Sequence, residues 1–208
     1  MIKEDNYESN CCFCNEFVKA KKSKRIILET KNCIAFPSYG AIAEGHTLII
    51  PKKHWRSLRA MPNDIFSELI TLKEHVAELL EESYGQLVEF EHGMFGESSG
   101  GCGIDHAHLH LVPSNVQQPL SNQLPDDMVK IPVRNLQEIH TNKLLQDSSY
   151  LYIHEPNSKP FIVRIKSIPS QFLRKILANS LNNTNWNWRS IPQNKDFVTT
   201  VSKLCTSA

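Results

Sequence analysis

The chain has 208 residues, of which 40% are hydrophobic, enough to bury one sizeable core with a small appended lobe but hardly two full domains. Its 23 Lys and Arg residues nearly balance 22 Asp and Glu residues, so the net charge of +1 gives no broad field for nucleic acid or an anionic membrane. Residues 1–6 are polar and no apolar run approaches the ~20 residues of a membrane helix, so we expect a cytoplasmic protein.

The first half of the chain predicts strands around one long helix. Residues 25–29, 33–37 and 46–51 are rich in Ile, Leu and Phe and are separated by polar or glycine-containing breaks, as in an antiparallel sheet. Asn63 can cap a helix in which apolar residues recur at helical spacing until Gly85. A strand is expected at residues 87–92, followed by a glycine-rich loop over 93–103 and a strand over 106–113.

The second half predicts an appendage. Residues 117–127 read as a loop, 128–133 as a short strand and 136–145 as a helix. A hairpin is expected to pair residues 150–154 with 161–165, and two helices are expected at 170–181 and 195–204. The predicted fold class is therefore α+β, an antiparallel sheet with flanking helices and a C-terminal hairpin and helices appended.

Three alternating histidines carry the strongest chemical signal. In a strand, His106, His108 and His110 share one face at roughly 6.5–7 Å intervals, while Ala107 and Leu109 face the core. Imidazole can act as a nucleophile or a proton donor near neutral pH, as phosphoryl transfer requires. The preceding loop offers hydroxyls and unobstructed backbone N–H groups for phosphate oxygens, from Ser98, Ser99, Gly100, Gly101 and Gly103. The alternative is that the histidines form a metal site or lie on the surface by chance.

The run His-Ala-His-Leu-His-Leu-Val from His106 resembles the His-φ-His-φ-His-φ-φ signature of the histidine-triad superfamily, where φ is apolar. Gly45 to His54 is similar to the family's Gly-His-x-Leu-φ-Ile-Pro-Lys-x-His strand, and Cys11 to Cys14 to its Cys-x-φ-Cys. The resemblance covers roughly residues 10–115. It implies a nucleotide-processing domain over residues 1–115 and a homodimer. We expect residues 116–208, which carry no motif of the family, to form an extension packed on that domain.

The same resemblance implies the roles of the histidines. His108 would attack the α-phosphorus to form a nucleotidyl-histidine intermediate, and His110 would contact phosphate or assist the leaving group. His106, the first histidine of the motif, completes the predicted catalytic set.

A zinc site is the second chemical prediction. Cys11 and Cys14 have the spacing of two thiolates on one tetrahedral ion, which needs two further ligands. The resemblance implies that His54 and His106 supply them. The zinc would be structural, with no catalytic cofactor; the alternative is that both cysteines are simply buried thiols.

Several positions depart from the family pattern. Ser38 stands where many relatives carry a ribose-binding Asp, Cys102-Gly103 replaces Gln-Ser or Gln-Thr, and Glu91-His92-Gly93 replaces Asn-x-Gly. We assign no role to the polar residues near the motif, Glu91, His92, Glu97 and Asp105. Trp186 and Trp188 are expected in packing rather than in stacking on a base.

The predicted function is hydrolysis of dinucleoside polyphosphates, nucleotide conjugates or phosphoramidates through a nucleotidyl-histidine intermediate, on a small-molecule nucleotide and not on nucleic acid or at a membrane. Alternatives are a nucleotidyltransferase or phosphorylase, a non-catalytic nucleotide-binding protein, and a metal-dependent hydrolase. Retention of all three histidines argues against pure binding.

Overall fold

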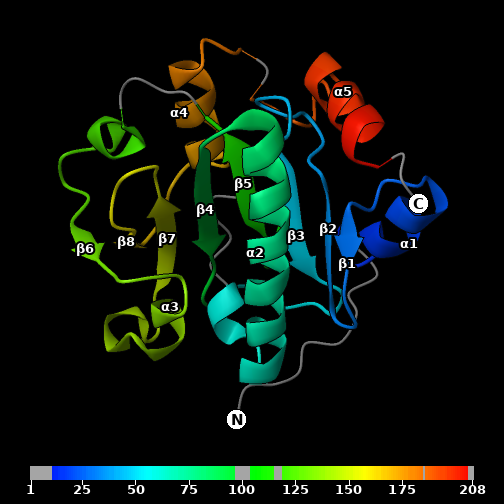
Figure 1. The fold of residues 1–208 in the computed structure, drawn as a ribbon. Helices are drawn as coiled ribbons and strands as arrows, with labels where there is room; N and C mark the ends of the chain where they lie inside the picture. The colour runs from blue at the N-terminus through cyan, green and yellow to red at the C-terminus, as the bar shows by residue number, and fades with distance from the viewer. Residues whose placement is uncertain (1–10, 97–103, 115–118, 185, 206–208) are drawn as a thin grey trace.

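The computed structural model describes residues 11–96, 104–114, 119–184 and 186–205. Within these ranges eight strands form one sheet in the order β1-β2-β3-β5-β4-β7-β8-β6, and the paired neighbours run antiparallel. Figure 1 shows the long helix α2 lying across one face of the central strands. This arrangement confirms the predicted α+β fold with an antiparallel sheet and flanking helices.

The strands are β1 (Leu28–Glu29), β2 (Cys33–Pro37), β3 (Thr47–Pro51), β4 (Leu87–Gly93), β5 (Leu109–Pro113), β6 (Lys130–Pro132), β7 (Ser149–His154) and β8 (Phe161–Ile165). The helices are α1 (Glu16–Lys22), α2 (Asn63–Tyr84), α3 (Glu138–Thr141), α4 (Phe172–Ser180) and α5 (Lys195–Leu204), with 3₁₀ turns η1 (Leu58–Ala60), η2 (Leu120–Gln123) and η3 (Lys143–Leu145).

Helix α2 and the central strands form the main core. The helix buries a stripe at helical spacing that packs on Ala107, Leu109 and Leu111 from the histidine segment; its buried residues are Phe66, Leu69, Ile70, Leu72, Val76 and Leu80. Successive strand residues point to opposite faces, so this packing turns His108 and His110 toward the other face of the sheet. The core thereby fixes the orientation of the histidines.

The second half of the chain enlarges the same sheet. Strand β7 pairs with β4 from Glu89↔His154 to Gly93↔Tyr150, and the predicted hairpin β7–β8 is present. Helix α4 buries Leu173 and Leu177 in a second core on the face opposite α2. Helix α4 of the extension therefore lies on the face of the sheet that carries His108 and His110.

Several local predictions need correction. Asn63 is not the N-cap of α2; Pro62 occupies that position, and Asn63 Oδ1 lies 3.1 Å from Nδ1 of His140. Strand β1 is shorter than residues 25–29, because the Arg25 side chain donates to Glu16 at 2.6 Å and its backbone N–H bonds Ala20.

Two further element boundaries differ. The regular strand β5 begins at Leu109, so His106 and His108 precede it. The predicted helix over 136–145 is split into α3 and η3 by Asn142, whose side chain accepts from the N–H of Leu144 and so starts a new turn.

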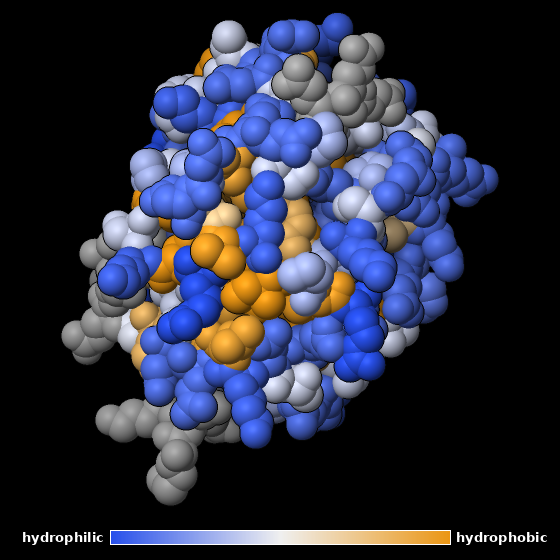
Figure 2. Space-filling model, turned by 90° about the vertical axis from the view of Figure 1, so that its left-hand side faces the viewer, coloured by the Kyte–Doolittle hydropathy of each residue, from blue (hydrophilic) through white to orange (hydrophobic). Residues whose placement is uncertain are grey.

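Strand β6 forms one end of the sheet and is only three residues long, which limits the unpaired edge open to other chains. Figure 2, which looks from the β6 side, shows hydrophobic residues in a band across this face. Val129, beside β6, is 72% exposed. Among the described helices, none combines the length and hydropathy needed to cross a membrane.

Candidate functional site

A cavity of about 390 Å³ lies over His108 and His110, in the size range of ligand sites. Three parts of the chain line it. The sheet and the segments next to its strands supply Ser38, Leu48, Phe90, His92, Ile104, His108 and His110; the N-terminal segment supplies Cys12, Phe13, Glu16 and Lys19; the extension supplies Gln171, Phe172, Leu173, Arg174, Trp188, Pro192 and Gln193. The histidines therefore lie at the base of a largely apolar pocket with a few polar groups.

His108 is held in one tautomer. Its Nδ1 lies 2.6 Å from the carbonyl oxygen of His106, so Nδ1 carries the proton and donates it. Burial, supported by the positive charge of Arg174, lowers the pKa of His108 to about 4. At neutral pH the ring is therefore uncharged, and Nε2 keeps an unprotonated lone pair, as a nucleophile requires.

His110 is held in the opposite tautomer by His46. The backbone N–H of Ile42 donates to Nδ1 of His46 at 3.3 Å, so the proton of His46 is on Nε2. That N–H faces Nδ1 of His110 at 2.9 Å, which leaves the proton of neutral His110 on Nε2. Burial and the neighbouring histidines hold the pKa of His110 well below its ordinary value. The pair thus offers one lone pair, on His108, and one N–H donor, on His110.

Aromatic rings fix both imidazoles in place. Phe90 stacks on His110 with ring centroids 4.2 Å apart, and Phe13 meets His108 edge-on at 5.3 Å. The pairing of Phe90 with His110 in the β4–β5 register puts these rings side by side. The histidines therefore have little freedom to leave the geometry that their hydrogen bonds define.

Arg174 of α4 connects the extension to the sheet and brings positive charge to the cavity. Its guanidinium donates to Ser38 Oγ at 3.2 Å and to the carbonyl of Gly40 at 2.5 Å, and its Nε donates to the carbonyl of Trp186. The side chain is buried and lines the cavity. Its charge also contributes to the low pKa of His46.

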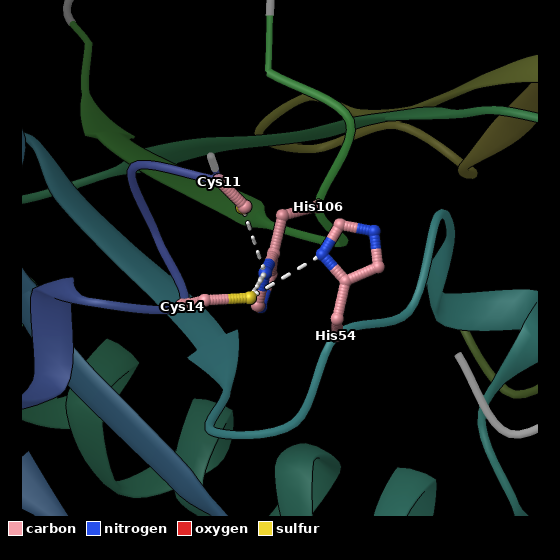
Figure 3. A group of neighbouring side chains, drawn as sticks. All are labelled: Cys11, Cys14, His54 and His106. Carbon is pink, nitrogen blue, oxygen red and sulfur yellow. Dashed lines mark hydrogen bonds between the residues drawn. The ribbon is translucent and has the colours of Figure 1, made fainter. Parts of the chain in front are cut away.

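The four predicted metal ligands lie together. Cys11, Cys14, His54 and His106 place one ligand atom each within 4.8 Å of all the others. Figure 3 shows both cysteines of the N-terminal segment facing the rings of His54 and His106. Cys14 Sγ lies 3.4 Å from His54 Nδ1 and 3.7 Å from His106 Nδ1, and Cys11 Sγ lies 3.5 Å from His106 Nδ1.

The donor set fits a tetrahedral zinc ion. Zn–S bonds of about 2.3 Å and Zn–N bonds of about 2.0–2.1 Å place neighbouring ligand atoms roughly 3.3–3.8 Å apart, and the three sulfur–nitrogen distances given above fall in that range. His106 donates from Nε2 to the carbonyl of Pro51 at 2.8 Å, which leaves Nδ1 unprotonated toward the thiols. The cluster can therefore hold a divalent metal between the N-terminal segment and the sheet.

The structure separates the three predicted catalytic histidines into two groups. His108 and His110 line the cavity, whereas His106 belongs to the cysteine cluster and reaches His108 through its carbonyl oxygen. The predicted phosphate-binding residues Ser98, Ser99, Gly100, Gly101 and Gly103 lie outside the described residues. Ile104, the first described residue after them, lines the cavity.

Sequence reasoning missed several cavity residues. His92 faces the cavity, and Trp188 lines it rather than serving in packing alone. Side chains alternate between the two faces of a strand, so His92 shares a face with Phe90 in β4, and this pattern could have indicated that His92 faces the cavity. Glu91 points to the other face, where its carboxylate accepts from the Leu58 N–H at 2.7 Å and the Tyr150 hydroxyl at 2.6 Å. Asp105 pairs with Arg56 at 2.7 Å.

Comparison with known proteins places this geometry in a family. The family model of the HIT domain matches residues 19–116. An uncharacterized HIT-like protein of Mycoplasma genitalium is 32% identical over 118 residues, which cover 53% of this chain and 77% of that protein. The chain belongs to the histidine-triad (HIT) family.

A relative in that family has a named activity. An adenosine 5′-monophosphoramidase of Candida albicans is 29% identical over 108 residues, which cover 50% of this chain and 70% of that protein. The crystal structure of a HIT-like protein from Bartonella henselae matches 55% of this chain and 89% of its own, with 24% identity and a TM-score of 0.43. At the level of the family, the named activity of the Candida albicans relative and the match to the HIT domain support a nucleotide hydrolase.

Proposed function

We propose that this protein hydrolyses nucleotide conjugates, nucleoside phosphoramidates among them, through a nucleotidyl intermediate on Nε2 of His108. The observation that carries the proposal is the hydrogen bond from His108 Nδ1 to the His106 carbonyl, which leaves the opposite nitrogen unprotonated in a ligand-sized cavity. The phosphoramidase activity of the Candida albicans relative supports the substrate class.

The reaction divides into two displacements at phosphorus. The lone pair of His108 Nε2 forms a bond to the α-phosphorus as the bond from phosphorus to the leaving group breaks, and the leaving group takes the electron pair. Water then attacks the same phosphorus, the P–N bond returns its pair to His108, and a nucleoside monophosphate and a proton are released. The N–H on His110 Nε2 is suited to donate to a phosphoryl oxygen, where charge develops.

We also propose that zinc binds Cys11, Cys14, His54 and His106 and has a structural role. When bound, the ion would anchor Phe13, which lies between the two cysteines in sequence and contacts the His108 ring. This chain's own residues supply the nucleophile and donors of the reaction. The metal's contribution would be to fix the wall of the cavity.

Intact-protein mass spectrometry tests the proposal. Wild-type protein is mixed briefly with an adenosine phosphoramidate, a dinucleoside polyphosphate or a nucleotide sugar and quenched so that phosphohistidine survives. A nucleotide-sized adduct is expected in the wild type and not in His108→Ala. The matched control is His75→Ala, since His75 is exposed on α2, on the other face of the sheet.

The alternatives give different outcomes. A phosphorylase would consume the adduct faster with inorganic phosphate than with water alone. A binding protein would retain nucleotide without any adduct or turnover, which would refute the proposed chemistry. A metal-dependent hydrolase would lose the chemical step on chelation while the fold persisted. The homodimer and the cytoplasmic location remain predictions made from the sequence alone.

A further inference from the structure

His92 of β4 carries a buried ring nitrogen that the described part of the structure does not satisfy. The side chain is 6% exposed, and its Nε2 is buried without a hydrogen-bond partner among the residues that the structure describes. A buried polar atom without a partner destabilises a fold, so native structures contain few of them. A ligand that enters the cavity would supply the missing partner, because His92 lines the cavity together with His108 and His110.

The position of His92 in the sheet is set by its neighbours. Strands β4 and β5 pair as Val88↔Val112 and Phe90↔His110, where the ladder ends. His92 lies two residues after Phe90 in β4, and His108 lies two residues before His110, in the segment that leads into β5. His92 therefore faces the same cavity as the proposed nucleophile, from the neighbouring strand β4.

The two flanking histidines complement each other. His110 lies in β5, two residues after His108, and presents an N–H from Nε2, whereas His92 approaches from β4. Burial lowers the pKa of His92 to about 4, so the ring is neutral at pH 7 and serves as a hydrogen-bonding group rather than as a cation. The rings of His92, His108 and His110 all line the one cavity.

We propose that His92 is a further substrate-binding residue, whose Nε2–H donates a hydrogen bond to a non-bridging oxygen of the phosphoryl group that is transferred to His108. This inference rests on the proposed function. It extends that function by giving a role to His92, for which the sequence analysis predicted none. The ligand chemistry is that of a nucleoside 5′-phosphoryl group.

The kinetic test compares His92→Leu, which removes the donor, with His92→Gln, whose side-chain amide can still donate. The rate of adduct formation on His108 should fall roughly 10²-fold in His92→Leu, the usual loss for one donor to a developing oxyanion. It should fall less than about 10-fold in His92→Gln. His75→Leu is the matched control, since it removes an exposed imidazole on α2.

A binding test separates the inference from the chemistry. Calorimetry with AMP and with adenosine should show about 10-fold weaker AMP binding in His92→Leu. Adenosine should bind as it does to the wild type, because the proposed contact is to phosphate. Equal weakening of both ligands, or of neither, overturns the inference while the proposed function stands. A wild type that neither binds AMP nor forms an adduct overturns both.

Urea unfolding tests whether a loss of rate in His92→Leu comes from a loss of stability instead. Because Nε2 has no partner in the described structure, His92→Leu should unfold at a denaturant concentration no lower than that of the wild type. A marked fall in the unfolding midpoint that parallels the fall in rate would assign His92 to the fold and contradict the inference.

Discussion

Glu91 on β4 should make the stability of the protein depend on pH. The carboxyl group is fully buried, and its acceptors are used by the Leu58 N–H and the Tyr150 hydroxyl. Burial outweighs these hydrogen bonds and raises the pKa of Glu91 from 4.5 to about 7. The folded state therefore holds this proton more tightly than the unfolded state does.

The sign and size of the effect follow from linkage. Because the folded pKa is the higher one, stability due to this group is present below pH 4.5 and is lost as pH rises toward 7. At about 1.36 kcal/mol per pKa unit, the full loss is about 3 kcal/mol, most of which falls between pH 5 and pH 8. Above that window the loss is complete and constant.

The assay is urea unfolding of the wild type and of Glu91→Gln at intervals from pH 5 to pH 8. The Gln variant cannot ionise, so the wild type should lose roughly 2–3 kcal/mol relative to it across this range. The buried histidines titrate in both proteins, and their contribution cancels in the difference. Glu81→Gln on the exposed side of α2 is the control for removal of a charge. Parallel stability curves for wild type and Glu91→Gln would refute the reasoning.

Three further predictions test the core, the histidine pair and the metal cluster. Leu80→Ala should lower the free energy of unfolding by about 2–5 kcal/mol, since Leu80 is fully buried, whereas the exposed Val198→Ala should change it by under about 0.5 kcal/mol, both by urea titration. His46→Phe should reduce kcat roughly 10²-fold in steady-state assays, because His110 loses the partner that fixes its proton. The number of nucleotides bound per protein should change little. An unchanged kcat would contradict this role of His46. Cys14→Ser should lower bound zinc in elemental analysis and lower Tm; equal zinc content would contradict the site.

The strongest local patterns predicted their elements well. The apolar stripe of α2, the alternation around His108 and the hairpin of β7 and β8 each appear where the sequence indicates. These features depend on neighbours within a few residues, because helix and strand periods are properties of the local chain. The grouping of Cys11, Cys14, His54 and His106 was predicted as well, through the resemblance rather than through spacing alone.

Contacts between distant segments were not predictable in this way. The tautomer of His110 depends on His46, which is 64 residues away, and the wall over the nucleophile includes Arg174 and Trp188 from the second half of the chain. The motifs that contain His46 and His110 do not say that the two rings meet, and no motif covers Arg174 or Trp188. His46 meets His110 because β3 pairs with β5, with Leu48 opposite His110. Arg174 and Trp188 reach the cavity because the β4–β7 pairing attaches the extension to the sheet and brings α4 to the face with the histidines.

Glu91 and His92 show most clearly which features the sequence determines and which depend on the tertiary structure. The sequence by itself determined that they are neighbours in a strand and so point in opposite directions. Only the tertiary structure decided which one meets the buried Tyr150 and which one meets the cavity, since that choice depends on the face that α2 covers. The chemistry of the pair is therefore set by packing: alternation is local, but the identity of each face is a property of the whole sheet.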